Sequence, residues 1–156
     1  MITCFFDHKA KANLRHVTAS SIAFRTGKIL LVKRSPQSRQ GGKWCLPGGL
    51  LNLGETTKEC ALREFLEETG FSGKIISLFL INDNPHRKNE IWQMVDFVFL
   101  VKPDKKIQDH DGEQTEVKWF WLNKLPAEKD FAFDHFDVIQ LFKKHLTKPF
   151  KLPILL

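Results

Sequence analysis

Three glutamates near the middle of the 156-residue chain have the type and spacing of metal ligands. A helix is expected over residues 56–69, and at about 100° per residue Glu64, Glu67 and Glu68 share one face of it, opposite an apolar face. Carboxylate oxygens are the ligands that hard cations such as Mg²⁺ and Mn²⁺ prefer. A metal held there could neutralise a polyanionic substrate and activate a water molecule for hydrolysis.

The same spacing also occurs on helix faces that simply face solvent, because like charges one turn apart cost only a few tenths of a kcal/mol. The surrounding residues decide between the two interpretations. Seven residues stand in a fixed pattern: Gly49, Glu55, Arg63, Glu64, Glu67, Glu68 and Gly70. At roughly one in twenty per position, such a pattern arises by chance about once in 10⁹ trials, so the spacing favours a dedicated site.

This pattern, with Phe65 and Phe71 at its apolar positions, is the Nudix box, and no position departs from it. The chain therefore resembles a Nudix hydrolase. The resemblance implies an α/β fold, a Nudix-type α/β/α sandwich around a mixed β-sheet, in a single domain over residues 1–156. Residues 1–14 and 147–156 are terminal segments whose place in that fold stays open.

The resemblance also implies a Mg²⁺ (or Mn²⁺) cofactor held by the three glutamates. In the family the backbone carbonyl at the position of Gly48 is itself a ligand, and a glycine there lets the backbone approach the metal closely. Arg63 is expected to point away from the metals and to pair with Glu55, which would orient the glutamates. Gly70 is expected to end the helix as a left-handed cap.

A fourth carboxylate is expected from the segment that follows residue 104, because family members commonly bring one to the metals from this region. Glu113 and Glu116 are the candidates. Glu116 is favoured because it begins a predicted aromatic strand and would be held more rigidly than a loop residue. The alternative is that Glu116 only solubilises an edge strand. Either Glu64 or Glu116 would help to deprotonate the attacking water.

Cationic and aromatic side chains outside the box are candidates for substrate binding. The segment 34–43 is polar and contains glycine, which predicts a loop at the mouth of the site. Arg34 in this loop could meet substrate phosphates, or it could be ordinary surface charge. Trp92 and Trp119 offer ring faces on which a nucleobase could stack, although a tryptophan on a strand is more often part of the core.

A narrower resemblance, to the small ADP-ribose pyrophosphatase-type members, rests on three features. Pro85, a candidate substrate-binding residue, lies 14 residues after Phe71, close to the place of a loop proline in those members. The segment 131–135, Phe-Ala-Phe-Asp-His, resembles one of their motifs, with His135 expected to be structural rather than catalytic. The chain has no tyrosine, whereas a tyrosine marks the subfamily that splits dinucleoside polyphosphates.

These features predict a metal-dependent hydrolase in which water attacks phosphorus of a nucleoside diphosphate linked to another moiety, either ADP-ribose or a related ADP-X compound. Two alternatives stay open. One is a pyrophosphohydrolase of nucleoside triphosphates, oxidised ones included, or of an RNA 5′ end. The other is a Nudix-fold sensor that binds a nucleotide without cutting it. The complete box favours an enzyme, because a sensor would be free to lose glutamates.

Hydrophobic periodicity predicts the elements that must position these residues. Strands are expected at residues 16–24, 28–33, 74–82, 90–102 and 116–122, and a second helix at 134–146. The first two strands would form a hairpin, and Trp92 and Asp96 would share one side of the fourth strand. Asp134 is expected to cap the second helix.

Composition limits the remaining choices. The net charge of +6 and the pI near 9.3 would suit a polyanionic partner, but a merely basic surface explains them equally well, and nucleic acid is not the expected partner.

Cys4, Cys45 and Cys60 show neither a disulfide framework nor zinc spacing. No apolar run is long enough for a signal peptide or a membrane span, so a cytoplasmic enzyme is expected. The apolar tail after residue 147 should pack on the domain or on a second subunit, which would allow a homodimer.

Overall fold

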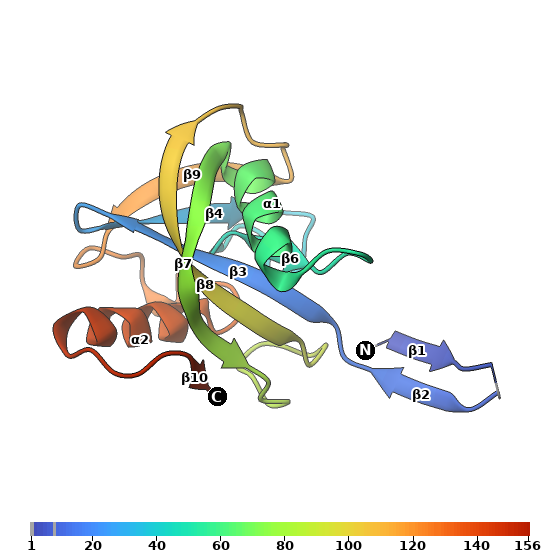
Figure 1. Ribbon diagram of the computed structural model, residues 1–156. Coiled ribbons are helices and arrows are strands. Elements are labelled where there is room, and N and C mark those ends of the chain that lie inside the picture. The colour runs from blue at the N-terminus through green and yellow to red at the C-terminus, as the bar shows by residue number, and fades with distance from the viewer. Residues whose placement is uncertain (1, 8) are drawn as a thin grey trace.

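A mixed sheet of eight strands lies between two helices in the computed structural model, which describes residues 2–7 and 9–156 (Figure 1). The elements in chain order are β1 (Ile2–Phe5), β2 (Lys11–Leu14), β3 (Val17–Arg25), β4 (Lys28–Arg34), β5 (Trp44–Cys45), β6 (Gly48–Leu50), α1 (Thr57–Thr69), β7 (Phe71–Asn82), β8 (Val95–Lys106), β9 (Gln114–Trp121), the 3₁₀ turn η1 (Glu128–Asp130), α2 (His135–Thr147) and β10 (Ile154–Leu155).

The sheet combines parallel and antiparallel pairs. Its main order is β10-β7-β8-β3-β4-β5, with β6 paired to β3 and β9 paired to β4. Strands β3 and β8 are parallel, as are β10 and β7, whereas β7 and β8, and β4 and β9, are antiparallel. The predicted α/β fold around a mixed sheet is therefore confirmed, and the predicted hairpin at residues 16–33 is β3 and β4.

Each face of the sheet carries its own apolar core, because side chains alternate along the strands. Ile29 and Leu31 of β4 pack on the side of α2, with Ile139 and Phe142 from that helix. Leu30 lies between them in sequence and packs on the side of α1, with Phe65 and other residues of that helix. The sheet is therefore buried on both faces, which gives α1 a rigid support.

Helix α1 begins and ends as its sequence predicts. The side chain of Thr56 accepts a hydrogen bond from the backbone N–H of Glu59, and the Glu59 side chain accepts from Thr56 N–H, which is a capping box. At the other end Gly70 adopts a left-handed φ of 75° and its N–H donates to Leu66 O. A Cβ on Gly70 would lie 2.1 Å from the carbonyl oxygen of Gln108, so only glycine fits this cap.

The fourth predicted strand begins later than the sequence pattern indicates. Strand β8 starts at Val95, so Trp92 does not share a strand with Asp96, and the predicted start at residue 90 is wrong. Two features prevent extension before Val95. The Glu90 carboxylate accepts the backbone N–H of Trp92 at 2.7 Å, and Gln93 has a φ of 52°. Residues 83–94 therefore form a structured loop.

Asp134 occupies the N-cap position of α2 but does not cap it, so the predicted capping role is wrong. Its carboxylate instead accepts two hydrogen bonds from the buried guanidinium of Arg87, at 2.9 and 2.6 Å, and a third from Asn82. An unpaired buried guanidinium would cost several kcal/mol, which exceeds the gain from one helix cap. This pair ties the 83–94 loop to the start of α2.

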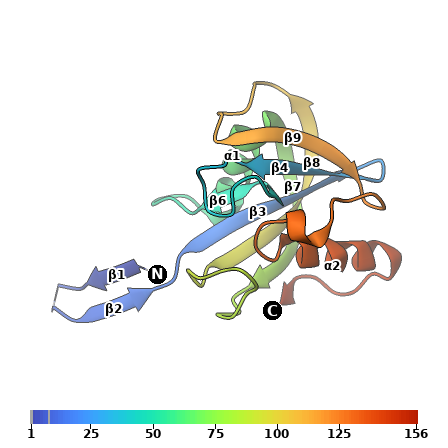
Figure 2. The same ribbon diagram turned by 180° about the vertical axis from the view of Figure 1, so that it is seen from behind.

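The two ends of the chain differ in how they relate to the main sheet. The tail forms β10 beside β7, and Phe150, Leu152 and Ile154 pack on the core of the α2 side. Of the two expected positions for the tail, on the domain or on a second subunit, the structure shows the first. Residues 2–14 contain the β1–β2 hairpin, which projects from the main sheet (Figure 2). All three cysteines are free. Within the described residues, the helices are too short or too polar to span a membrane.

We predict that Asp134→Asn destabilises the protein by about 3 kcal/mol at pH 7, because it leaves the Arg87 guanidinium without its charged partner. Burial would raise the pKa of Asp134, but the hydrogen bonds and charge of Arg87 outweigh it and lower that pKa. The stabilisation is therefore complete above the pKa of the unfolded chain and is lost as the pH falls through the lower folded value. Urea unfolding measured at several pH values checks this.

The matched control is Asp137→Asn, which removes an exposed carboxylate from the first turn of the same helix. It should change the free energy of unfolding much less than Asp134→Asn. The difference between wild type and Asp134→Asn should shrink below about pH 4. A difference that stays constant down to acid unfolding would contradict the role of the ion pair.

Candidate active site

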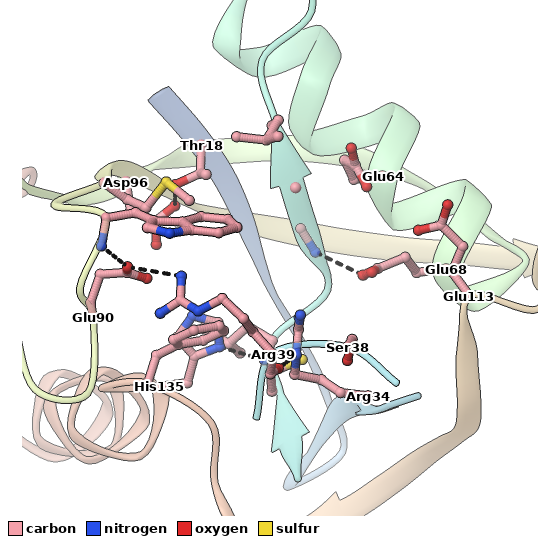
Figure 3. Close-up of a pocket in the computed structure, with 18 of the residues that line it drawn as sticks. Thr18, Arg34, Ser38, Arg39, Glu64, Glu68, Glu90, Asp96, Glu113 and His135 are labelled. Carbon is pink, nitrogen blue, oxygen red and sulfur yellow. Dashed lines mark hydrogen bonds and ion pairs between the residues drawn. The ribbon is translucent and has the colours of Figure 1, made fainter. Parts of the chain in front are cut away.

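A cavity of about 450 Å³ opens beside α1, above β3, β6 and β8. Figure 3 shows Glu64, Glu68 and Glu113 along one side of it and Thr18, Glu90 and Asp96 along the opposite side. Arg34, Arg39 and His135 lie at its base in this view. The volume is in the range of small-molecule sites, and the lining combines both signs of charge with aromatic rings.

Two glycines of β6 allow the backbone to pass close to the helix glutamates. A Cβ on Gly49 would lie 2.3 Å from the carboxylate oxygen of Glu64, and a Cβ on Gly48 would lie 2.4 Å from the carbonyl oxygen of Ala19. The backbone N–H of Gly48 donates to Glu68 at 2.9 Å. The sequence motif thus brings main-chain polar groups of β6 into direct contact with the glutamates of α1.

Glu68 is a buried carboxylate with only 4% of its surface exposed. It accepts hydrogen bonds from Gly48 N–H and from the side-chain amide of Gln114. Burial raises its pKa to about 8; the bond from Gly48 opposes this shift, and the charge of Glu64 adds to it. Burial also raises the pKa of Glu64, with Arg63 acting against it. Additional positive charge in the site would therefore stabilise the charged forms of both carboxylates.

Arg63 connects the glutamates of the box. Its guanidinium donates to both carboxylate oxygens of Glu55, at 3.0 and 2.8 Å, so the pairing with Glu55 is present. It also donates to Glu64 at 2.8 Å and to Glu67 at 2.9 Å. Arg63 thus turns toward two of the three glutamates as well as toward Glu55. The reason is that Glu67 lies one turn further along the same side of α1.

The described residues include no group of three acidic, histidine or cysteine side chains that converge closely enough to hold a metal ion as they stand. Existing partners account for this, because Arg63 engages Glu64 and Glu67 while Gly48 and Gln114 engage Glu68. The donor chemistry nevertheless fits a hard divalent cation, since every candidate ligand atom is a carboxylate or main-chain oxygen. Two of these carboxylates also have raised pKa values that a cation would lower.

Of the two candidates for a further carboxylate next to the α1 glutamates, Glu113 lines the cavity and Glu116 does not. Glu116 pairs with Lys33 at 3.2 Å and its side chain is 48% exposed. The cause is a register shift in the β4–β9 pair, where Arg34 pairs with Gln114 and Lys33 pairs with Glu116, so Thr115 is the extra residue in the strand register. This bulge breaks the alternation of side chains. Gln114 consequently faces Glu68, and Glu116 faces solvent.

An aromatic and cationic wall lies across the cavity from the glutamates. The guanidinium of Arg39 stacks 4.3 Å from the ring of Trp92 and 5.4 Å from the ring of Phe133, and it pairs with Glu90. Trp92 is 41% exposed and lines the cavity, as does Arg34, whose Nε donates to the carbonyl of Arg39. Two of the predicted substrate-binding residues are thus at the site.

Two other aromatic or loop candidates lie outside the cavity. Trp119 packs against the core on the α1 side and contacts Phe71. It is therefore a core residue, which was the alternative to base stacking. Pro85 is exposed in the 83–94 loop and does not line the cavity, so the structure does not bring it to the site. That loop reaches the site through Arg87, Glu90 and Trp92 instead.

Several cavity residues were missed by sequence reasoning, namely Thr18, Arg39, Arg87, Glu90, Asp96 and Gln114. Asp96 had a signal, because it is the one charged residue in the apolar run 95–101. Arg39 and Glu90 had none, since they meet across 51 positions of sequence. His135 accepts the backbone N–H of Leu46 at 3.0 Å through Nδ1, and burial lowers its pKa, which agrees with a structural role.

The chain belongs to the Nudix family, because residues 14–142 match the model described as NUDIX domain. It is 33% identical over 126 residues to the ADP-ribose pyrophosphatase of Methanocaldococcus jannaschii, covering 80% of this chain and 70% of that protein. It is 28% identical to putative nudix hydrolase 1 of Caenorhabditis elegans, covering 75% of this chain but only 32% of that protein.

Solved structures share the fold. A Nudix hydrolase from Nitrosomonas europaea superposes with a TM-score of 0.77 at 23% identity, covering 99% of this chain and 92% of that one. The Nudix domain of Shewanella oneidensis NrtR, solved in complex with ADP ribose, superposes with a TM-score of 0.69 at 26% identity, covering 91% and 94% of the two chains. Family membership makes the protein a hydrolase of phosphoric anhydride bonds.

We predict that Gly49→Ala retains the fold but lowers kcat by about 100-fold, because the new Cβ would displace the Glu64 carboxylate. The displaced group is the end of a flexible side chain, so the melting temperature should stay close to that of wild type. Gly48→Ala is the comparison, since its Cβ would meet backbone and should lower the melting temperature. A Gly49→Ala enzyme with wild-type kcat would contradict the placement of Glu64 in the site.

Proposed function

We propose that this protein hydrolyses ADP-ribose or a closely related ADP-X compound with Mg²⁺ or Mn²⁺ as cofactor. The observation that carries the proposal is the division of one cavity into a carboxylate side, with Glu64, Glu68 and Glu113, and an opposite aromatic side, with Trp92. A nucleoside diphosphate has the same two parts, a charged diphosphate and a flat base. The names of the archaeal relative and of the NrtR complex support this choice of substrate.

The cofactor would be held by Glu64, Glu68 and Glu113 together with the carbonyl of Gly48, and Glu67 could join them once released from Arg63. When bound, a divalent cation neutralises phosphate charge and lowers the pKa of a coordinated water. The protein supplies the remaining groups. Because Arg63 also pairs with Glu64, it would keep that carboxylate oriented as the charge in the site changes.

Proton transfer from the attacking water is assigned to Glu64. It lies beside Gly49, it lines the cavity, and Glu116, the other candidate base, is directed away to Lys33. Arg34 lines the same cavity and carries a permanent positive charge that the substrate phosphates can meet. These assignments place the reacting phosphorus between the α1 glutamates and Arg34.

A second candidate function is hydrolysis of oxidised guanine nucleotides. The chain is 25% identical over 152 residues to the human 8-oxo-dGDP phosphatase, although it covers only 45% of that protein. The metal side of the site would be the same for both substrates. They differ in the base and in the group attached to the diphosphate.

We predict that Glu68→Gln lowers kcat by about 100-fold or more and weakens Mn²⁺ binding in titration calorimetry, because it removes a ligand charge. Folding should survive, since the substitution replaces a buried carboxylate by a neutral group of similar shape. Glu116→Gln is the matched control and should keep kcat within about threefold of wild type. Wild-type metal affinity in Glu68→Gln would refute the assignment of this ligand.

The substrate is tested with a panel of ADP-ribose, NADH, dinucleoside polyphosphates, nucleoside triphosphates, 8-oxo-dGTP and 8-oxo-dGDP, each with Mg²⁺ and with Mn²⁺. We expect ADP-ribose to have the highest kcat/KM, because contacts to both the base and the terminal sugar contribute to transition-state binding. An oxidised guanine nucleotide that leads by about tenfold would replace the first proposal by the second.

A further inference from the structure

We propose that Thr18 and Asp96 form a hydrogen-bond acceptor pair that recognises the exocyclic amine of the substrate base. The inference rests on the proposed function and adds the part of the substrate that this side of the cavity reads. Both residues line the cavity, and they lie on the side opposite Glu64 and Glu68 (Figure 3). They are direct partners in the parallel β3–β8 register, so the sheet holds them in place.

The hydroxyl hydrogens around Asp96 are all directed toward other protein atoms. Thr18 Oγ1 donates to Asp96 Oδ1 at 3.0 Å, with the carbonyl of Val95 at 3.4 Å as the other acceptor in reach. Ser20 Oγ donates to the same carboxylate, 3.0 and 3.1 Å from its two oxygens. A hydroxyl has a single hydrogen, so Thr18 offers the cavity only lone pairs. Asp96 as a carboxylate has no hydrogen to offer.

The carboxylate of Asp96 is buried beside a cationic side chain. Asp96 is 2% exposed, and the guanidinium of Arg87 lies 3.8 Å from it. A carboxylate has about four lone-pair positions, and the two hydroxyls and Arg87 leave room for a further donor. This end of the cavity therefore favours a ligand group that donates hydrogen bonds, and it disfavours one that only accepts them.

The neighbouring surfaces favour a flat ring over a sugar or a phosphate. Trp92, Arg39 and Phe133 form a stack of planar groups along this side of the cavity. Glu90, whose side chain is 4% exposed, adds a second carboxylate here. The cations at this end, Arg39 and Arg87, are already engaged by carboxylates, so the diphosphate belongs at the side of Arg34 and α1, where the proposed metal would also bind. A planar ring with a donor at its edge is an amino-substituted nucleobase, and adenine, the base of the proposed substrate, has this donor in its 6-amine.

The test compares kcat/KM for ADP-ribose with that for its purine analogue, in which hydrogen replaces the 6-amine. Wild type should prefer ADP-ribose by about tenfold or more, because the analogue leaves the acceptor pair without a donor. In Thr18→Val, which keeps the volume but removes the acceptor, the preference should fall below about threefold. Thr18→Ser restores the hydroxyl and should restore the preference. The ratio of the two kcat/KM values, measured on one variant, does not depend on the fraction of that variant that is folded.

Ser20→Ala is the matched control, because it removes the other hydroxyl bonded to Asp96 from a residue that does not line the cavity. It should keep the wild-type ratio. Asp96→Asn can present an amide N–H and should lower the ratio as Thr18→Val does. If wild type cleaves both compounds equally well, or if Ser20→Ala loses the preference as fully as Thr18→Val, the inference fails while the proposed function stands. If wild type cleaves neither compound, the proposed function fails and the inference falls with it.

Discussion

The close approach of the β6 backbone to the glutamates of α1 is the constraint on which the site depends. The N–H of Gly48 donates to Glu68, and the space that a Cβ on Gly49 would need is filled by the Glu64 carboxylate. This contact fixes the rotation of α1 about its axis and buries Glu68 against the strand. Burial in turn raises the pKa of the carboxylate, so the same contact that completes the fold creates the need for positive charge in the site.

Charge is distributed unevenly around the cavity. Carboxylates stand on both sides of it, while Arg34 and Arg39 lie between them at the base (Figure 3). The proposed diphosphate would be held where cations outweigh the carboxylates, which is near Arg34 and near the metal proposed to bind at α1. The opposite side, around Asp96, suits neutral donors. The electrostatics of the cavity thus orient an asymmetric substrate before any chemistry takes place.

Two loops complete the site and are joined to each other. Arg39 pairs with Glu90, and Gln40 donates to the carbonyl of Asn89 and accepts the backbone N–H of Phe133. The buried pair of Arg87 and Asp134 anchors the second loop to α2. The aromatic and cationic wall of the cavity is therefore built from three segments that are far apart in sequence. These polar contacts join the segments directly, because neither loop has a helix or strand of its own.

The sequence by itself determined the box helix, its Gly70 cap, the glycine turn and the α/β alternation, because each of these depends on residues within one or two turns or strands of each other. Tertiary structure decided the rest. A one-residue bulge in β9 turned Glu116 to solvent and brought Gln114 to Glu68, and the Glu90 contact ended β8 before it reached Trp92. Strand register and loop contacts couple residues separated by tens of positions. No local pattern contains that information, so the glutamates of α1 were readable from spacing, whereas most of the residues across the cavity from them were not.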